Sequence, residues 1–376
     1  MREQDILARL VGFATITGGP NLALIDWAQA LLTGAGFTVT RVASRDGQKA
    51  GLLAKYGAGD GGVLFSAHSD VVPVAGQDWT GDPFTLTQRG DWLVGRGATD
   101  MKGFLACVLA RAERVQSAPP LHPMRIALSW DEELGCLGIP EMIDHVLPSL
   151  GRPDLVIVGE PTSLRLCTGH KGKAAYRATC RGEPGHSAMA PQFTNALHLA
   201  ADLVQALRAV QARLAETGAR EPGYEIGYST LHVGKLSGGV ALNMVPELAT
   251  VDFEIRHVAA DDPAELLAQV IAALPEGVAD RIAVDEVNAY PGLAADPTDP
   301  AIAALATQLD DPAPVKVSYG TEAGFFAALG LPTVVCGPGD MADGHQPNES
   351  IATAELSRCT ALIDRLTAPA DKTLPG

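Results

Sequence analysis

Short apolar runs with little polar alternation constrain the fold of this chain most. Residues 63–67, 126–130 and 155–158 are almost entirely apolar. A strand that is buried on both faces has this pattern, whereas a strand with one wet face alternates. Residues 101–115 and 139–147 have helical spacing, so strands and helices alternate along the chain. This order predicts an α/β layered domain with a mixed, mostly parallel sheet.

The pattern changes near Lys171. From there the predicted order is strand, helix, two strands, helix and strand, which is typical of a ferredoxin-like α+β fold. We therefore predict a discontinuous domain of residues 1–171 and 291–376, with residues 172–290 as an inserted second domain. Asn21 is predicted to cap an early helix, and Asp262 a helix of the insertion.

Charge and cysteine usage limit the function classes. With 28 basic and 44 acidic residues the net charge is −16, which argues against nucleic acid or an anionic membrane as partner. The six cysteines are scattered without a CxxC pair, as in free thiols of a reducing compartment. No leader-like start and no apolar run of membrane-spanning length is present, so we expect a cytoplasmic protein.

Side chains that bind metals follow several of the predicted strands or begin a helix. They are His68 and Asp70, the triplet Asp131-Glu132-Glu133, Glu160, His345, and Asp100 at a helix start. Because carboxyl ends of strands border the ligand crevice in an open α/β sheet, these groups are expected to converge. Two histidines with several carboxylates form a donor set that suits zinc, manganese or cobalt.

Each of these residues also has an ordinary structural explanation. His68 alone is compatible with a hydrogen-bonded core histidine, Asp100 with a helix cap, and Glu160 with a turn residue before Pro161. His345 alone is compatible with a surface loop. The coincidence of all four at predicted element ends favours a metal site.

The acidic triplet and Asp70 carry separate expectations. Like charges this close raise one another's pKa unless a cation lies among them. We expect the triplet to be extended, so that Glu132 and Glu133 point opposite ways and perform different tasks. Asp131 has no assigned task and is expected to face backbone donors of the turn. Asp70 is expected to accept the second ring N–H of His68, with direct metal ligation as the alternative.

Five motifs in order carry a family resemblance over essentially the whole chain. They are His68-Ser69-Asp70-Val71-Val72-Pro73, Gly95-Arg96-Gly97-Ala98-Thr99-Asp100-Met101-Lys102-Gly103, Asp131-Glu132-Glu133, Gly159-Glu160-Pro161-Thr162 and Gly185-His186-Ser187. Together they resemble the zinc-dependent amidohydrolase and metallopeptidase family. That family includes acetylornithine deacetylase, succinyl-diaminopimelate desuccinylase and carboxypeptidase G.

The resemblance implies a catalytic domain from both ends of the chain, an inserted lid or dimerisation domain, and a site for two divalent ions. Zinc is the first choice of metal and cobalt the alternative. By the resemblance, Asp100 bridges both metals and is followed by a cis peptide bond. His68 and Glu160 complete one metal site, and Glu133 and His345 the other.

The resemblance also implies the catalytic roles. Glu132 would act as general base and then general acid in amide hydrolysis. His186 would donate a hydrogen bond to the oxyanion in the partner subunit's site, which implies a homodimer. For His186 alone, a hinge or strand-end residue is the alternative.

Substrate preference is expected from further matches. Asn243 and Arg256 match positions that hold a substrate carboxylate, and Glu322 is a hypothetical partner of a substrate ammonium group. The alternatives are a strand-end surface arginine and a helix N-terminal glutamate. The stretches Gly169-His170-Lys171-Gly172 and Tyr319-Gly320-Thr321-Glu322-Ala323-Gly324-Phe325 look most like acetylornithine deacetylases.

The expected reaction is therefore hydrolysis of N2-acetyl-L-ornithine to ornithine and acetate, in arginine biosynthesis. The sequence just before His345 differs from the one expected in those enzymes; here it is Met341-Ala342-Asp343-Gly344. The alternatives are a desuccinylase, an aminoacylase, a carboxypeptidase, or a metal-binding protein without catalysis.

Overall fold

The computed structural model describes residues 2–368, and the chain divides into two compact units. The first contains the chain up to Gly169, Leu293–Lys316 and the chain from Thr321 onward. The second contains His170–Gly292 and Val317–Gly320. The sequence predicts an insertion of residues 172–290 and gives no reason to separate Val317–Gly320 from their neighbours. No helix among the described residues is both long and apolar enough to cross a membrane.

The first unit is built on a nine-stranded sheet. Its strand order is β1-β2-β6-β3-β7-β17-β8-β15, and β16 pairs with β8. The strands are β1 (Thr38–Ala43), β2 (Ala50–Tyr56), β3 (Val63–His68), β6 (Met124–Ser129), β7 (Leu155–Pro161), β8 (Cys167–His170), β15 (Leu293–Ala294), β16 (Val315–Val317) and β17 (Thr333–Gly337). The central strands β6, β3, β7 and β17 are parallel, and β1 and β2 are antiparallel to their neighbours. The predicted fold class, an α/β layered domain with a mixed sheet, is confirmed.

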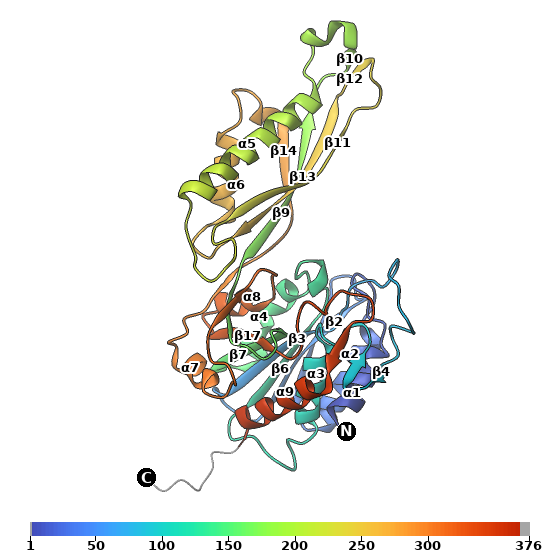
Figure 1. Ribbon diagram of the computed structural model, residues 1–376, viewed down its shortest axis with the longest axis vertical. Coiled ribbons are helices and arrows are strands. Elements are labelled where there is room, and N and C mark those ends of the chain that lie inside the picture. Colours follow the sequence, from blue (N-terminus) through green and yellow to red (C-terminus); the bar gives the residue numbers. More distant parts are fainter. Residues whose placement is uncertain (1, 369–376) are drawn as a thin grey trace. The chain divides into compact units, whose positions relative to one another are not determined.

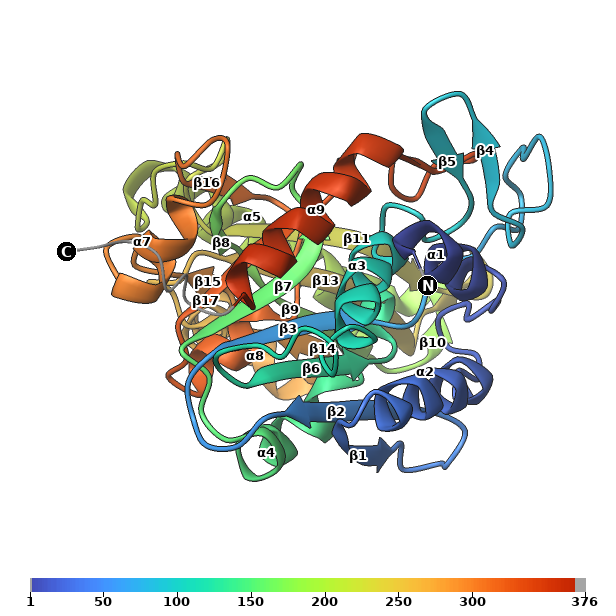
Figure 2. The same cartoon turned by 90° about the horizontal axis from the view of Figure 1, so that it is seen from below.

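Helices cover both faces of this sheet, which explains the continuous apolar runs. Helices α1 (Glu3–Val11), α3 (Lys102–Ala112) and α9 (Thr353–Leu366) pack together on one face (Figure 2). The buried sides of α2 (Leu22–Gly34) and α7 (Pro300–Ala306) join the same core. Helices α4 (Ile139–Leu150) and α8 (Ala323–Ala328) pack against the other face. Every residue of β3, β6 and β7 is therefore buried.

The second unit has the predicted β-α-β-β-α-β order. Its main elements are β9 (Gly172–Arg181), α5 (Ala196–Thr217), β11 (Thr230–Gly238), β13 (Leu248–His257), α6 (Pro263–Ala272) and β14 (Ile282–Tyr290). The strands form an antiparallel sheet in the order β11-β13-β9-β14, with both helices on one side (Figure 1). Alternate residues of β9 and β13 are buried against the helices. The ferredoxin-like prediction is confirmed.

Smaller elements complete the two units. In the second, β10 (Gly185–His186) pairs with β12 (Met244–Val245) at one end of the sheet (Figure 1). In the first, β4 (Thr87–Arg89), β5 (Trp92–Val94) and β18 (Ser350–Ala352) form a separate three-stranded sheet. Short 3₁₀ turns occupy Glu132–Leu134, Ser187–Gln192 and Ala279–Arg281.

The two predicted helix caps have different outcomes. Asp262 accepts the main-chain N–H of Ala264, as expected of a cap. The cap predicted at Asn21 is wrong, because its side chain bonds elsewhere. Its amide exchanges two hydrogen bonds with the main chain of Ala50 and donates a third to the Ser69 hydroxyl. Asn21 thereby connects the start of β2 with the loop after β3. Because its side chain is engaged in these hydrogen bonds, the N-terminus of α2 has no side-chain cap.

Candidate metal centre

Adjacent parallel strands bring the candidate ligands together. His68 is the last residue of β3, Glu160 lies near the end of β7, and Glu132 and Glu133 follow β6. Because β6, β3 and β7 are neighbours and parallel, their carboxyl ends meet at one sheet edge. The sequence-based expectation of convergence is met for these residues.

Asp100 lies between two histidines. His68 Nε2 is 3.1 Å from Asp100 Oδ1 and 3.7 Å from Glu160 Oε1. His345 Nε2 is 3.1 Å from Asp100 Oδ2 and 3.0 Å from Glu133 Oε2. One carboxylate therefore presents a separate oxygen to each of two groups of ligand-type atoms. The peptide bond after Asp100 is cis, as the resemblance implied.

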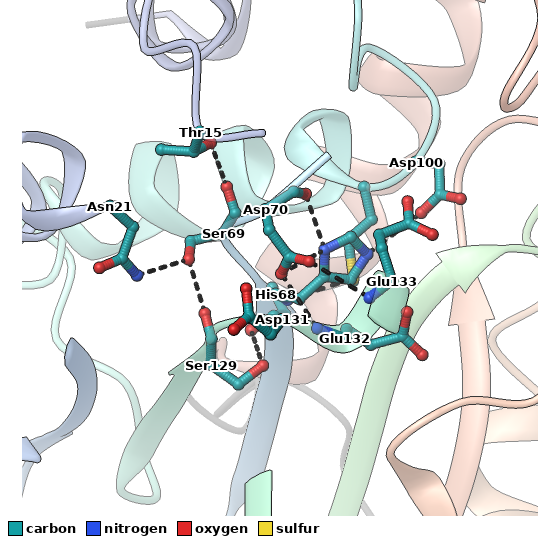
Figure 3. A network of polar contacts seen from close by, with 12 residues as sticks. Thr15, Asn21, His68, Ser69, Asp70, Asp100, Ser129, Asp131, Glu132 and Glu133 are labelled. Carbon is teal, nitrogen blue, oxygen red and sulfur yellow. Dashed lines mark hydrogen bonds and ion pairs between the residues drawn. The ribbon is translucent and has the colours of Figure 1, made fainter. Parts of the chain in front are cut away.

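Glu132 belongs to the same cluster. One ligand-type atom each of His68, Glu132 and Glu160 lies within 4.8 Å of the others, and so do those of His68, Asp100 and Glu133. Figure 3 shows Asp100, Glu132 and Glu133 together on one side of the His68 ring. Two histidines are thus surrounded by four carboxyl groups.

The electrostatics of the cluster favour a cation. Burial and neighbouring carboxylates raise the pKa values of Glu132 and Glu160 well above the usual value of a glutamate. The same causes raise the pKa of Glu133 to about 7. Hydrogen bonds to Asp100 and Glu133 raise the pKa of His345 to about 10. Burial raises the pKa of Asp100, but hydrogen bonds from both histidines outweigh it and hold that pKa below its usual value.

One orphaned atom supports the same conclusion. Glu160 Oε1 is buried and has no hydrogen-bond partner among the described residues. A buried polar atom without a partner costs free energy, and a bound cation would remove that cost. The residues present therefore fit divalent metal ions, with His68, Asp100, Glu133, Glu160 and His345 as the groups able to hold them.

Asp70 and its main chain position both His68 and the acidic triplet. His68 Nδ1 is 2.9 Å from the main-chain oxygen of Asp70 and 3.5 Å from its carboxylate. A carbonyl only accepts, so Nδ1 is a donor to it, while Nε2 faces Asp100 and Glu160. The nearest partner of Nδ1 is thus the Asp70 carbonyl and not the expected carboxylate. That carboxylate accepts the main-chain N–H groups of Glu132 and Glu133, both at 3.2 Å.

The prediction of an extended triplet is wrong. Glu132–Leu134 form a 3₁₀ turn, which begins after Asp131 in the left-handed region at φ 51°. Asp131 accepts the Gly18 N–H at 2.8 Å and forms an ion pair with Lys49, so its partners come from distant segments. The placement of Glu132 and Glu133 is therefore set by this turn and not by strand alternation. The turn also brings the Cys136 thiol to 3.4 Å from Glu132 Oε1.

Glu322 lies in the first unit, buried to 1% exposure. Burial raises its pKa to about 7, and the Ser129 hydroxyl opposes this by hydrogen bonding. Its Oε1 has no hydrogen-bond partner in the part of the chain that the structure describes, and its side chain does not cap α8. Glu322 therefore stands at the N-terminus of α8, as the alternative of a helix N-terminal glutamate has it, but its side chain makes no capping hydrogen bond there.

Three further predicted residues belong to the second unit. His186 lies in β10, Asn243 precedes β12, and Arg256 lies near the end of β13. Arg256 Nε donates to Glu254 at 2.9 Å and its Nη1 to the Tyr290 hydroxyl at 2.7 Å. Their roles at the metal centre stay predictions.

Sequence reasoning missed Glu349, which is buried to 1% exposure beside the loop that carries Asp100. Its carboxylate accepts the main-chain N–H groups of Gly97, Thr99 and Asp100. The one feature of the sequence that could have pointed to Glu349 is its position four residues after the predicted ligand His345.

Comparisons with known proteins agree with this geometry. The model of peptidase family M20/M25/M40 matches residues 64–368. A protein from Myxococcus xanthus named acetylornithine deacetylase is 33% identical, covering 96% of this chain and 96% of its own. One of the same name from Proteus mirabilis is 32% identical, covering 93% of this chain and 90% of its own.

Solved structures share the fold at lower identity. An M20 family metallo-carboxypeptidase from Sulfolobus solfataricus has a TM-score of 0.78 at 18% identity, covering 98% of both chains. Aminopeptidase PepT from Bacillus cereus has a TM-score of 0.75 at 18% identity, covering 97% of both chains. A Bacillus subtilis protein described as a dinuclear metal-binding peptidase of family M20 has a TM-score of 0.67 at 13% identity, covering 97% of this chain and 98% of its own.

Proposed function

Because this chain belongs to peptidase family M20/M25/M40 and is a metal-dependent hydrolase, we propose that it hydrolyses N2-acetyl-L-ornithine to ornithine and acetate. The observation that carries the proposal is the position of Asp100 between two groups of ligand atoms, with Glu132 beside them. Relatives named acetylornithine deacetylase, at 32–33% identity over most of the chain, support the choice of substrate. Arginine biosynthesis is the proposed setting.

We propose two divalent ions, zinc first and cobalt as the alternative. His68, Asp100 and Glu160 would hold one, and Asp100, Glu133 and His345 the other. Two such ions, when bound, act as Lewis acids that polarise an amide carbonyl and make water more acidic.

Glu132 is the proposed proton carrier. One of its carboxyl oxygens lies within 4.8 Å of ligand-type atoms of His68 and Glu160, and Glu132 is not among the five residues that we propose as ligands. Burial and neighbouring carboxylates raise the pKa of Glu132, which favours taking up a proton. Glu132 would remove a proton from the attacking water and deliver it to the leaving amine nitrogen, so that the proton count balances. The Asp70 carboxylate and the Cys136 thiol hold Glu132 at its main chain and at Oε1.

His186 has the hydrogen-bonding state that an oxyanion donor needs. Its Nδ1 is 3.1 Å from the main-chain nitrogen of Ala188, which can only donate. Nδ1 is therefore the acceptor, and the ring proton lies on Nε2. An exposed imidazole with a proton on Nε2 can donate to the developing oxyanion of the amide.

The dimensions of the second unit favour a homodimer. The main-chain N–H of Ser187 donates to the Asn243 carbonyl, so His186 and Asn243 lie together. Arg256 is eight residues beyond the start of β13, which places it roughly 26 Å along the sheet from that end. One chain therefore cannot place Asn243 and Arg256 on the same substrate carboxylate. We propose that Arg256 acts in its own subunit's site and that Asn243 and His186 act in the partner's.

Exposed apolar residues near Asn243 agree with a dimer. Val240 is 95% exposed and Leu242 is 100% exposed, and a second copy of the chain would cover such residues. Co-expression of His186→Ala with Glu132→Ala chains tests the arrangement. A mixed dimer has one intact site only if His186 crosses the interface, so activity should reappear. If the mixture stays as inactive as either variant alone, His186 does not act across the interface.

Glu322 is proposed to bind the substrate's side-chain ammonium group through its orphaned oxygen. A hydrogen bond to a charged group contributes about 1.5–3 kcal/mol, so Glu322→Gln should raise KM for N2-acetylornithine roughly 10- to 100-fold. N-acetylnorvaline, which lacks the ammonium, serves as the control substrate, and its KM should not change. Equal effects on both substrates, or none on either, would remove this role.

A substrate panel tests the proposed function. Purified protein with zinc or cobalt restored is assayed for acetate, succinate and amino-acid release from N-acetyl, N-succinyl and peptide substrates. N2-acetylornithine should give the highest kcat/KM. Preference for succinyl-diaminopimelate, another N-acyl amino acid or a peptide would identify a relative's activity instead, and no hydrolysis by metal-loaded protein would favour a non-catalytic metal binder. A cytoplasmic location is proposed because all six cysteines are buried free thiols.

A further inference from the structure

Glu349 receives hydrogen bonds only from the loop that carries Asp100, as far as the described residues show. Its Oε1 accepts the main-chain N–H groups of Thr99 at 2.9 Å and Asp100 at 3.0 Å. Its Oε2 accepts the Gly97 N–H at 3.0 Å and Arg96 Nη1 at 2.6 Å. Four donors within five consecutive residues therefore converge on one buried carboxylate.

The same network reaches the loop that carries His345. Arg96, which is fully buried, also donates through Nη2 to Gln77 Oε1. Gln77 Nε2 in turn donates to the main-chain oxygen of His345 at 2.8 Å. We call Gln77, Arg96 and Glu349 the Glu349 clamp, because its contacts connect the Asp100 loop with the His345 loop.

His345 needs such support more than His68 does. His68 ends a buried strand, and its ring is fixed by the Asp70 carbonyl. His345 lies in a turn at φ 60°, with 47% of its side chain exposed. Packing alone does not fix a side chain that is half exposed. The hydrogen bond from Gln77 to the His345 main chain therefore helps to position the His345 ring.

A charged carboxylate at the buried position of Glu349 also costs free energy. Glu349 adds a buried carboxylate next to Asp100, in a cluster that already contains several acidic groups. A buried ion pair contributes little net stability compared with apolar packing. A carboxylate is, however, suited to gathering several N–H donors into one fixed arrangement.

We propose that the Glu349 clamp positions Asp100 and His345 and so sets the metal affinity of the Asp100–Glu133–His345 half of the centre. The half that contains His68 and Glu160 has its own support from Asp70 and depends on the clamp only through Asp100. The inference rests on the proposed two-metal function. It assigns Gln77, Arg96 and Glu349 as positioning residues that do not touch substrate.

Metal titration of the full chain tests this proposal. Wild-type protein and Glu349→Gln are stripped of metal and titrated with Zn²⁺ against a chromogenic chelator, and with Co²⁺ followed by its visible absorption. The amide of glutamine has one acceptor atom in place of two, so half of the loop's N–H donors lose their partner. We expect the first equivalent to bind nearly as in wild type and the second about 10- to 100-fold more weakly.

Further variants separate positioning from a general loss of stability. Gln77→Ala cuts the link between Arg96 and His345, together with the hydrogen bond that Gln77 accepts from Trp79 Nε1, and leaves the bonds of Glu349 in place. It should weaken the second equivalent by a smaller factor, and it tests the proposal even if the Glu349→Gln chain does not fold. Asp364→Asn, which removes an ion pair with Arg114 elsewhere in the unit, is the matched control and should bind both equivalents normally. Excess Zn²⁺ should restore the kcat of Glu349→Gln.

The outcomes are distinct. If folded Glu349→Gln and Gln77→Ala both bind two equivalents as wild type does, or lose both equally, the clamp does not have this role. If wild-type protein itself binds no divalent ion, the proposed function fails, and this inference fails with it.

Discussion

Glu132→Gln should lower kcat by about 10²- to 10⁴-fold while the metal content stays that of the wild type. Glutamine has nearly the same shape as glutamate but cannot accept and return a proton, and general acid–base catalysis contributes this range. All five proposed ligands stay intact in this variant, so the metals should remain. Steady-state kinetics and elemental analysis of one preparation measure both quantities.

Glu133→Gln is the matched comparison, because it changes the neighbouring residue by the same isosteric substitution. Glu133 Oε2 is 3.0 Å from His345 Nε2, so this variant should lose metal first and activity as a consequence. Added Zn²⁺ should restore part of the activity of Glu133→Gln and none of that of Glu132→Gln. Near-normal turnover by Glu132→Gln would contradict its assignment as proton carrier.

Asp100→Asn should weaken both metal equivalents by more than about 100-fold, the largest effect on metal binding of any single substitution in the cluster. Each oxygen of Asp100 faces a different histidine, so the amide removes an anionic ligand from both halves at once. Elemental analysis after gel filtration should find little metal, and activity should be lost in parallel. Asp82→Asn, on an exposed turn in the same unit, provides a control that should keep both equivalents. Two tightly bound equivalents in Asp100→Asn would show that Asp100 does not bridge.

Most of the fold could be predicted because a strand that is buried on both faces has a continuous apolar sequence. The apolar runs of β3, β6 and β7 are buried throughout, and β9 and β13 alternate as one-sided strands should. Strand β4 has no such pattern, because all three of its residues are exposed. Val317–Gly320 belong with the second unit through contacts that local pattern does not encode.

The candidate ligands could be predicted because strand ends place them, but the finer geometry could not. The turn at Asp131 depends on Gly18 and Lys49, which are far away in sequence, so the expectation of an extended triplet had no local signal against it. Glu349 is recognisable only once the Asp100 loop is folded around its carboxylate. Asn21 has cap-like neighbours in sequence, but tertiary contacts to Ala50 and Ser69 take its side chain instead.

The central claim is that paired metal sites in this chain drive hydrolysis of N2-acetylornithine. The most direct measurement is acetate release from that substrate by metal-stripped protein titrated with Co²⁺ or Zn²⁺. We expect no release without metal, and activity that rises with added metal and levels off as the second equivalent binds. Full activity in the stripped protein, or no hydrolysis with two equivalents bound, would contradict the claim.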